Sequence, residues 1–182
     1  MKILITGSNG LLGQKLVHAL KDHPQIHLIA TARGENRIRD KHGYIYEALD
    51  ITDEKQVIDM VIEHRPDCII NTAAMTNVDE CEKDKEGCVK LNIDAVRYLV
   101  NACKLYNTHL IHLSTDFVFD GEAGPYHEED KPNPQSYYAW SKLESEKILN
   151  RKYDKCLSLV FLQHSHKHQL NLQPMLVNGI DR

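Results

Sequence analysis

The stretch Lys2-Ile3-Leu4-Ile5-Thr6-Gly7-Ser8-Asn9-Gly10-Leu11-Leu12-Gly13 decides the fold of this chain. Its first five residues predict a short buried strand, and leucines at every fourth position begin a helical pattern directly after the glycines. Gly7 lets the chain turn, Gly10 lets a pyrophosphate approach the backbone, and Gly13 lets the helix pack closely on the sheet. Free amides at the helix start then favour an anion. This order of elements predicts a nucleotide site, and the alternative is a turn that uses glycine for geometry alone.

The composition is ordinary for a globular protein and limits the expected partners. The 182 residues suit one domain, and 42% of them are hydrophobic and 26% charged. A formal net charge of -4 gives no electrostatic reason to expect nucleic acid or an anionic membrane. No apolar run approaches the ~20 residues of a membrane span, and we see no signal peptide. The cysteines form no Cys-x-x-Cys pair, so we expect a cytoplasmic protein without a zinc site.

The rest of the chain alternates predicted strands with predicted helices. Further strands are predicted at residues 26–32, 44–49, 67–71, 109–113 and 156–162. Helices are predicted behind the capping-box pattern of Asp53 and Gln56, from about 79 to 106, and from Tyr137 through Leu149. Such alternation requires right-handed crossovers and a parallel sheet. We therefore predict a doubly wound α/β fold of the Rossmann type, with helices on both faces, over residues 1–162.

Three arginines follow the second predicted strand and bear on the choice of cofactor. A carboxylate at this place hydrogen-bonds the ribose hydroxyls of NAD, whereas a cation can take the 2′-phosphate of NADP. This chain has Arg33, with Arg37 and Arg39 close behind, so NADP(H) is the preferred prediction. Glu35 keeps NAD(H) open, and the alternative is that the arginines form a solvated loop.

Small and polar residues near the later strands are weaker signals. Ala73 and Ala74 follow the fourth predicted strand, where small residues let a cofactor lie against the backbone but equally suit core packing. Asn92 lies beside the apolar stripe of the next helix, where it either faces solvent or ties a neighbouring strand or loop in place. Residues 120–136 form a loop too long for a plain connection, which makes them a candidate cover for a site.

Tyr138 and Lys142 lie one helical turn apart and so project from one face of their helix. A free tyrosine titrates near pH ~10, and a nearby lysine cation lowers that value towards the working range. Thr115, at the end of the fifth predicted strand, could hydrogen-bond the same substrate oxygen. The alternative for the tyrosine and lysine is a surface pair, but their place after a nucleotide motif and five strands favours an acid–base pair.

With these motifs together, the sequence resembles the extended short-chain dehydrogenase/reductases, and within them the dTDP-4-dehydrorhamnose reductase group. The resemblance covers about residues 1 to 152. The matching stretches are Thr6-Gly7-Ser8-Asn9-Gly10-Leu11-Leu12-Gly13, Asn71-Thr72-Ala73-Ala74, Leu91-Asn92, Ser114-Thr115-Asp116-Phe117-Val118-Phe119-Asp120-Gly121, and Pro132-Asn133-Pro134 before Tyr138-x-x-x-Lys142. The fourth stretch is the most specific for this group.

The resemblance implies hydride transfer from a nicotinamide to the 4-keto carbon of a nucleotide-linked deoxysugar, giving dTDP-rhamnose. It implies that Tyr138 protonates the developing alkoxide, and that Lys142 lowers the tyrosine pKa and bonds the nicotinamide ribose. It places Thr115 and Asp116 at the substrate, with Thr115 orienting the carbonyl. The implied cofactor contacts are Gly7, Asn9, Gly10, Leu11 and Leu12 at the pyrophosphate, Asp50 and Ile51 at the adenine, and Ala73 and Ala74 at the nicotinamide half, beside Tyr138 and Lys142. Arg33, from the arginine loop, is the further predicted cofactor contact.

The end of the chain departs from the family pattern. Members of the group continue for roughly another hundred residues that hold the sugar nucleotide, so we expect the C-terminal substrate lobe to be missing through truncation or a frameshift. Residues 163–182 form an atypical tail, in which His164, His166 and His168 alternate. We expect a poorly ordered tail rather than a metal site. The edge of the sheet that the missing lobe would cover favours pairing with another chain, for example in a homodimer.

Two functions without turnover remain alternatives to a reductase. Relatives of this group, such as the beta subunit of methionine adenosyltransferase, act as regulatory subunits that bind NADP and a partner enzyme. The other alternative is an inactive fragment of a reductase. A lost catalytic group would favour either of them, and Thr115, Tyr138 and Lys142 are all present.

Overall fold

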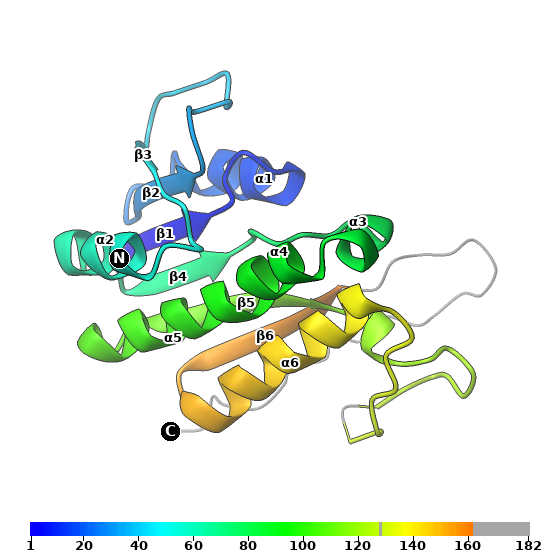
Figure 1. Cartoon of the computed structure of the whole chain (residues 1–182). Helices are drawn as coiled ribbons and strands as arrows, with labels where there is room; N and C mark the ends of the chain where they lie inside the picture. The colour runs from blue at the N-terminus through cyan, green and yellow to red at the C-terminus, as the bar shows by residue number, and fades with distance from the viewer. Residues whose placement is uncertain (128, 162–182) are drawn as a thin grey trace.

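A computed structural model, which describes residues 1–127 and 129–161, contains one six-stranded parallel sheet. The strand order is β3-β2-β1-β4-β5-β6 (Figure 1). The strands are β1 (Lys2–Thr6), β2 (His27–Ala32), β3 (Ile45–Ala48), β4 (Cys68–Asn71), β5 (His109–Thr115) and β6 (Cys156–Phe161). Strands β1 to β3 are added in one direction across the sheet, and β4 to β6 are added in the other, starting again beside β1. This order confirms the predicted doubly wound fold.

Helices cover both faces of this sheet. The longer helices are α1 (Leu11–Leu20), α2 (Glu54–His64), α5 (Ala95–Tyr106) and α6 (Tyr137–Lys152). Figure 1 shows α2, α5 and α6 side by side in front of the sheet, where their apolar faces meet Leu4, Ile69 and Leu110. On the other face, Val17 of α1 packs against Ile5 and its apolar neighbours.

The face under α2, α5 and α6 changes from apolar to polar as the strands approach their carboxyl ends. Leu4, Ile69 and Leu110 belong to its core, and the inward position two residues later on each strand is polar. Five registered neighbours across five strands make up this polar row: Thr31, Thr6, Asn71, His112 and Ser158. All of them are buried. Hydrogen bonds inside the protein satisfy the side chains of Thr31, Thr6, Asn71 and His112, whereas the Ser158 hydroxyl has no partner among the described residues.

The predicted helix from about 79 to 106 is divided, which corrects the sequence-based prediction. It consists of α3 (Val78–Lys83), α4 (Lys85–Val89), a π-helical turn, η1 (Lys90–Asp94), and α5. Asp84 ends α3 and then accepts a hydrogen bond at 2.9 Å from the backbone N–H of Gly87 as the N-cap of α4. Gly87 permits this cap, because a Cβ there would lie 2.2 Å from the Asp84 carboxylate. Both α3 and α4 lie against α6, and Glu82 of α3 accepts a hydrogen bond from the Tyr137 N–H at the start of α6.

The ends of the described chain bear on two further predictions. The sixth strand is confirmed at Cys156–Phe161, in parallel register with β5. The predicted tail at residues 163–182, with His164, His166 and His168, lies outside the described residues. Within the described residues, no helix combines the length and apolar character needed to cross a membrane.

Candidate active site

The glycine-rich turn after β1 brings bare backbone to the carboxyl edge of the sheet. Gly7 has a φ of +70°, and a Cβ on it would lie 2.7 Å from the backbone nitrogen of Ala73. A Cβ on Gly13 would lie 2.4 Å from the Gly7 carbonyl oxygen, so both positions require glycine. Gly10 is the N-cap of α1 and provides no side-chain hydrogen bond. The first amides of α1, from Leu11 and Leu12, therefore point from an uncapped helix end towards the space where an anion could lie.

The loop that carries the arginines is fastened to this turn by Asn9. The Asn9 side-chain amide donates to the Glu35 carbonyl at 2.9 Å and accepts from the Arg37 backbone N–H at 2.9 Å. The Tyr46 hydroxyl holds the same loop by donating to the Gly34 carbonyl at 2.7 Å. Asn9 was expected at the pyrophosphate. In the structure its side chain hydrogen-bonds to the arginine-bearing loop and holds that loop in position. Arg33 is exposed beside it.

The residues expected at the adenine and nicotinamide follow β3 and β4. The Asp50 carboxylate accepts hydrogen bonds from the Thr52 N–H at 2.9 Å and hydroxyl at 2.7 Å, which fixes the turn after β3. Ile51 is buried in the core and anchors that turn. Ala73 and Ala74 are half-buried beside the Gly7 turn.

Tyr138 stands in the first turn of α6, which Ser136 caps by accepting from the Ala139 N–H at 3.2 Å. The phenol is half-buried, and the edge of the Phe117 ring lies against it with the ring centroids 6.4 Å apart. Burial raises the pKa of Tyr138 above its ordinary value, while its hydrogen bond with Thr115 opposes that rise. The structure therefore joins Tyr138 to Thr115 and keeps the phenol protonated at neutral pH.

Lys142 is buried, and its amine points to the polar row. Its Nζ lies 3.0 Å from Nε2 of His112, and burial lowers its pKa to about 8, although the carboxylate of Glu146 on the next turn opposes the fall. Burial also raises the pKa of Glu146, which accepts a hydrogen bond from the Ser114 hydroxyl. The predicted lowering of the Tyr138 pKa by Lys142 is not found in this arrangement, where burial and the Thr115 hydroxyl are the largest influences on the phenol.

Asp116 and the loop behind it lie next to Thr115. The Thr115 hydroxyl donates to the Asp116 carboxylate at 3.2 Å and accepts from the Phe117 N–H at 3.3 Å. Further along, Asp120 accepts hydrogen bonds from the Tyr126 hydroxyl, the Asn133 side chain and the Glu122 N–H, and these lower its pKa to about 2. Asp120 therefore gives the long loop its shape. Whether that loop covers a substrate stays a prediction.

Asn92 is buried and does not face solvent. Its side chain accepts from the Met75 N–H at 2.8 Å and donates to the Met75 carbonyl at 3.0 Å and to the Ser141 hydroxyl at 2.9 Å. The residue sits in the π-helical turn η1, which re-aims it at the loop after β4 and at α6. Of the two readings of Asn92, the structure supports the one in which it ties a loop in place.

Sequence reasoning missed two buried polar residues of this region, Asn71 and His112. Both occupy inward positions near the ends of predicted strands, where alternation calls for apolar side chains. Their signal in the sequence was a polar side chain at a position of the strand where the alternation predicts a buried apolar one.

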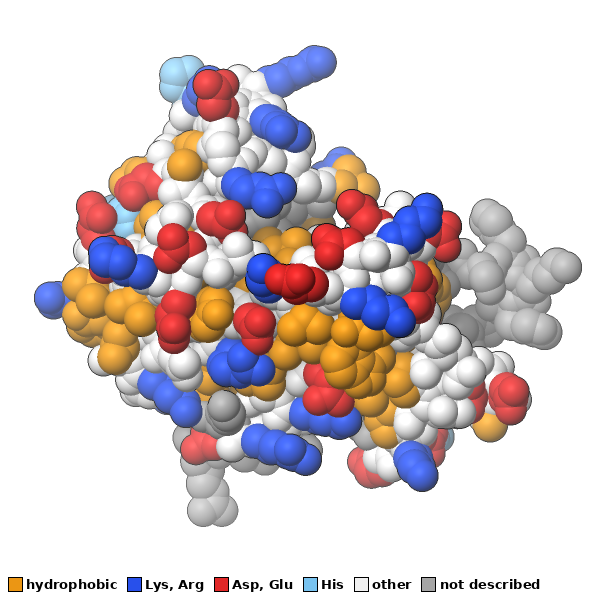
Figure 2. Space-filling model, in the orientation of Figure 1, with side chains coloured by type: hydrophobic (Ala, Val, Ile, Leu, Met, Phe, Trp, Pro, Cys, Tyr) orange, Lys and Arg blue, Asp and Glu red, His pale blue; other side chains and the backbone are white. Residues whose placement is uncertain are grey.

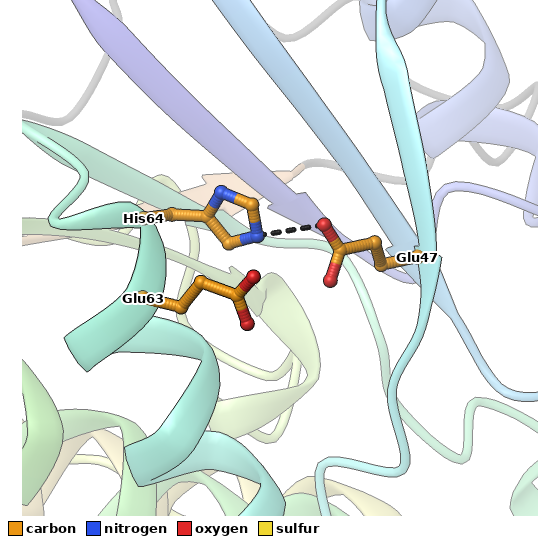
Figure 3. Close-up of side chains that lie close together, drawn as sticks. All are labelled: Glu47, Glu63 and His64. Atoms are coloured by element: carbon orange, nitrogen blue, oxygen red, sulfur yellow. Dashed lines mark ion pairs between the residues drawn. The ribbon is translucent and has the colours of Figure 1, made fainter.

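A separate group of side chains of the types that can ligate a metal lies on the far half of the sheet. Figure 3 shows Glu47 on β3 facing Glu63 and His64 at the end of α2, and their ligand atoms lie within 4.8 Å of one another. Nε2 of His64 is 2.8 Å from the Glu47 carboxylate. That ion pair joins α2 to the edge strand, and the prediction that the protein uses no metal is left untested.

The arrangement of a glycine-rich turn on β1 and a Thr-Tyr-Lys set at β5 and α6 has a counterpart among known proteins. Residues 1–165 match the family described as the RmlD substrate binding domain. This chain belongs to that family.

Individual members give the scale of the likeness. This RmlD-family chain is 35% identical over 149 residues to a dTDP-4-dehydrorhamnose reductase of Aggregatibacter actinomycetemcomitans, covering 81% of this chain and 46% of the relative. It is 35% identical over 148 residues to methionine adenosyltransferase 2 subunit beta of Bos taurus, covering 81% and 42%. The chain therefore spans about half the length of the curated relatives it matches.

Solved structures agree in fold. A hypothetical dTDP-4-dehydrorhamnose reductase from Sulfolobus tokodaii is 41% identical, with a TM-score of 0.76, over 89% of this chain and 56% of that one. The dTDP-4-dehydrorhamnose reductase of Bacillus anthracis, solved in complex with NADP, is 30% identical, with a TM-score of 0.73, over 88% and 53%.

Proposed function

We propose that this chain carries the cofactor half and the catalytic residues of an NADP(H)-dependent reductase that acts on the 4-keto group of a nucleotide-linked deoxysugar, as in dTDP-rhamnose synthesis. The observation that carries the proposal is that the half-buried Tyr138 phenol lies next to Thr115, whose hydroxyl opposes the rise of the phenol's pKa. Thr115 ends β5, and Tyr138 reaches it from α6. They lie at the same edge of the sheet as the glycine-rich turn after β1. The relatives named as dTDP-4-dehydrorhamnose reductases support the substrate class.

The residues present fit a nicotinamide dinucleotide. Any side chain at Gly7 would collide with the Ala73 backbone, so this turn stays bare for a pyrophosphate. The uncapped amides of α1 would hold that pyrophosphate, and exposed Arg33 would pair with a 2′-phosphate. NADP(H) is therefore the preferred cofactor, and NAD(H) would bind without the arginine pair. The bound nicotinamide would supply a hydride to the substrate carbonyl carbon.

The chain's own residues would manage the proton. Thr115 would hydrogen-bond the carbonyl oxygen and orient it towards Tyr138. Tyr138, which its raised pKa keeps protonated at neutral pH, would then give its proton to the developing alkoxide. The lysine one turn along α6 would offset the negative charge left on the phenolate. Burial of the phenol makes this local balance of charge more important than it would be in water.

A non-catalytic NADP-binding module is the second candidate. It is favoured by the 35% identity to methionine adenosyltransferase 2 subunit beta, whose name places it in a larger enzyme. Because the chain spans about half of each relative, turnover by this chain is the point that the experiment decides.

The deciding experiment mixes the purified chain with NADPH and dTDP-4-dehydrorhamnose and follows nicotinamide oxidation. For a reductase, Tyr138→Phe is expected to lower the rate by ~10²-fold or more, the usual contribution of a positioned acid. Tyr137→Phe is the matched control, because its ring keeps the contact with Trp140 at 4.8 Å. NADPH binding without oxidation would favour the module or an inactive fragment. Neither binding nor oxidation would overturn both candidates.

A further inference from the structure

His112 is buried in the middle of the polar row and uses both ring nitrogens. It is 1% exposed, and it lies in register with Asn71 on β4, which lies in register with Thr6 on β1. Its Nδ1 is 3.1 Å from the side-chain nitrogen of Asn71, and its Nε2 is 3.1 Å from the Ser145 hydroxyl. This ring thus links the sheet to α6.

The hydrogen bonds of Asn71 decide which ring nitrogen carries the proton. Its side-chain oxygen accepts from the Thr6 hydroxyl at 2.6 Å and from the Ala73 N–H at 3.3 Å. The Asn71 NH₂ group must therefore be the side that faces His112, and it donates to Nδ1. A neutral imidazole that accepts at Nδ1 carries its proton on Nε2.

Ser145 agrees with this assignment, and Lys142 is constrained by it. The Ser145 hydroxyl donates to the Lys142 carbonyl at 2.6 Å, so its oxygen is available to accept from Nε2–H. The Lys142 amine lies 3.0 Å from the same Nε2. If Lys142 were an ammonium group there, its N–H and the His112 Nε2–H would both be donors and would repel each other. A neutral amine has a lone pair that can accept from Nε2–H.

We propose that His112 is a positioning residue for Lys142: in the cofactor-free chain its Nε2–H is shared between the Ser145 oxygen and the neutral form of the Lys142 amine, which it holds as a hydrogen-bond acceptor. His112 thereby fixes the place of the lysine that serves Tyr138 and favours the loss of its proton above neutral pH. The direction of the Lys142 pKa agrees, since burial lowers it to about 8. The other titratable groups that influence Lys142 are Glu146 on α6 and Cys88 on α4. The catalytic meaning of this inference rests on the proposed function, but its physical content does not.

The test is made by NMR on the cofactor-free chain. Nitrogen-15 shifts of the histidine rings are expected to show His112 neutral, with its proton on Nε2, throughout neutral pH. A lysine side-chain signal that disappears in Lys142→Met is expected to titrate near pH 8. A charged His112, or one protonated on Nδ1, would overturn the proposal, and this measurement needs no other variant than the assignment control.

His112→Asn adds a second readout. Its amide can turn a carbonyl oxygen towards Lys142, which accepts from an ammonium group, so the titration midpoint of the lysine is expected to rise towards that of a free lysine. His109→Asn, at the exposed start of the same strand, is the matched control and should leave the midpoint unchanged. An unchanged midpoint in folded His112→Asn would overturn the proposal. His112→Gln makes the same comparison if the shorter amide does not fold.

The reductase assay separates positioning from structure. If His112 acts through Lys142, His112→Asn shifts the pH profile of kcat, whereas a purely structural role would lower the amount of active protein at every pH alike. Because the NMR result needs neither cofactor nor turnover, failure of the proposed function and failure of this inference are distinguishable.

Discussion

Replacing Lys142 by methionine is expected to stabilise the fold while removing a proposed catalytic group. The lysine is 2% exposed, and its pKa falls from 10.5 to about 8 because burial disfavours the ammonium form. A shift of that size corresponds to about 3 kcal/mol. At pH 7 the folded chain must carry the charge against that preference, so Lys142→Met removes a cost of up to about 3 kcal/mol.

The pH dependence has a definite sign. Between pH 8 and 10.5 the unfolded chain binds the lysine proton and the folded chain does not, so stability rises with pH across this window. The advantage of Lys142→Met is therefore complete below pH 8 and vanishes as the pH approaches 10.5.

Urea unfolding at pH 7 and at a series of higher pH values measures this advantage. Lys147→Met on the same helix is the control, because its amine lies in a partly exposed pair with Glu144 at 2.7 Å and should change stability by about 0.5 kcal/mol or less. A methionine variant that is less stable than the parent at pH 7, or whose advantage grows with pH, would refute the reasoning.

Two further substitutions test the residues that shape the site. Asn92→Ala would leave the N–H of Met75 without its partner and its carbonyl with only the Cys81 thiol, and is expected to lower the free energy of unfolding in urea by about 2 kcal/mol. Exposed Asn101→Ala on α5 is the control, and an equal loss in both variants would contradict the role assigned to Asn92. Asp120→Ala removes the acceptor for the Tyr126 hydroxyl, so limited proteolysis should cut the 120–136 loop faster. An unchanged cleavage rate would mean that the ring stack of Tyr126 on Phe119, with centroids 4.4 Å apart, suffices to hold the loop.

The sequence predicted the parallel sheet because short, largely apolar strands alternate with helical patterns along the chain. Gly7 predicted a sharp turn and Gly13 predicted close packing, and the structure contains both: Gly7 has a φ of +70°, and a Cβ on Gly13 would lie only 2.4 Å from the Gly7 oxygen. The continuous helix from about 79 to 106 was wrong in detail. Its apolar spacing hides both the Asp84 cap and the π-helical turn, since one extra residue barely alters a helical period.

The candidate site was predictable in its members more than in their interactions. Tyr138, Lys142 and Thr115 follow from spacing and order. The direction of the Lys142 side chain does not, because it depends on burial and on His112, a residue thirty positions away in sequence. Asn9 shows the same limit, since its hydrogen bonds to residues 35 and 37 exist only once the loop has folded over the turn.

Figure 2 shows charged side chains of both signs spread over the face that carries α2, α5 and α6, with hydrophobic side chains gathered over α6. Tyr137 and Trp140, with ring centroids 4.8 Å apart, lie near the start of that helix. The predicted homodimer stays a prediction, which sedimentation of the purified chain would measure.

NADPH binding by the purified chain, followed through nicotinamide fluorescence, tests the central claim most directly. A saturable change is expected, and Gly10→Ala should weaken it, because a methyl at this N-cap stands where the pyrophosphate would lie while meeting only the Gly7 oxygen at 3.2 Å. NADH should bind more weakly than NADPH, and Arg33→Ala should reduce that difference. A chain that unfolds cooperatively but leaves NADPH fluorescence unchanged would contradict the account.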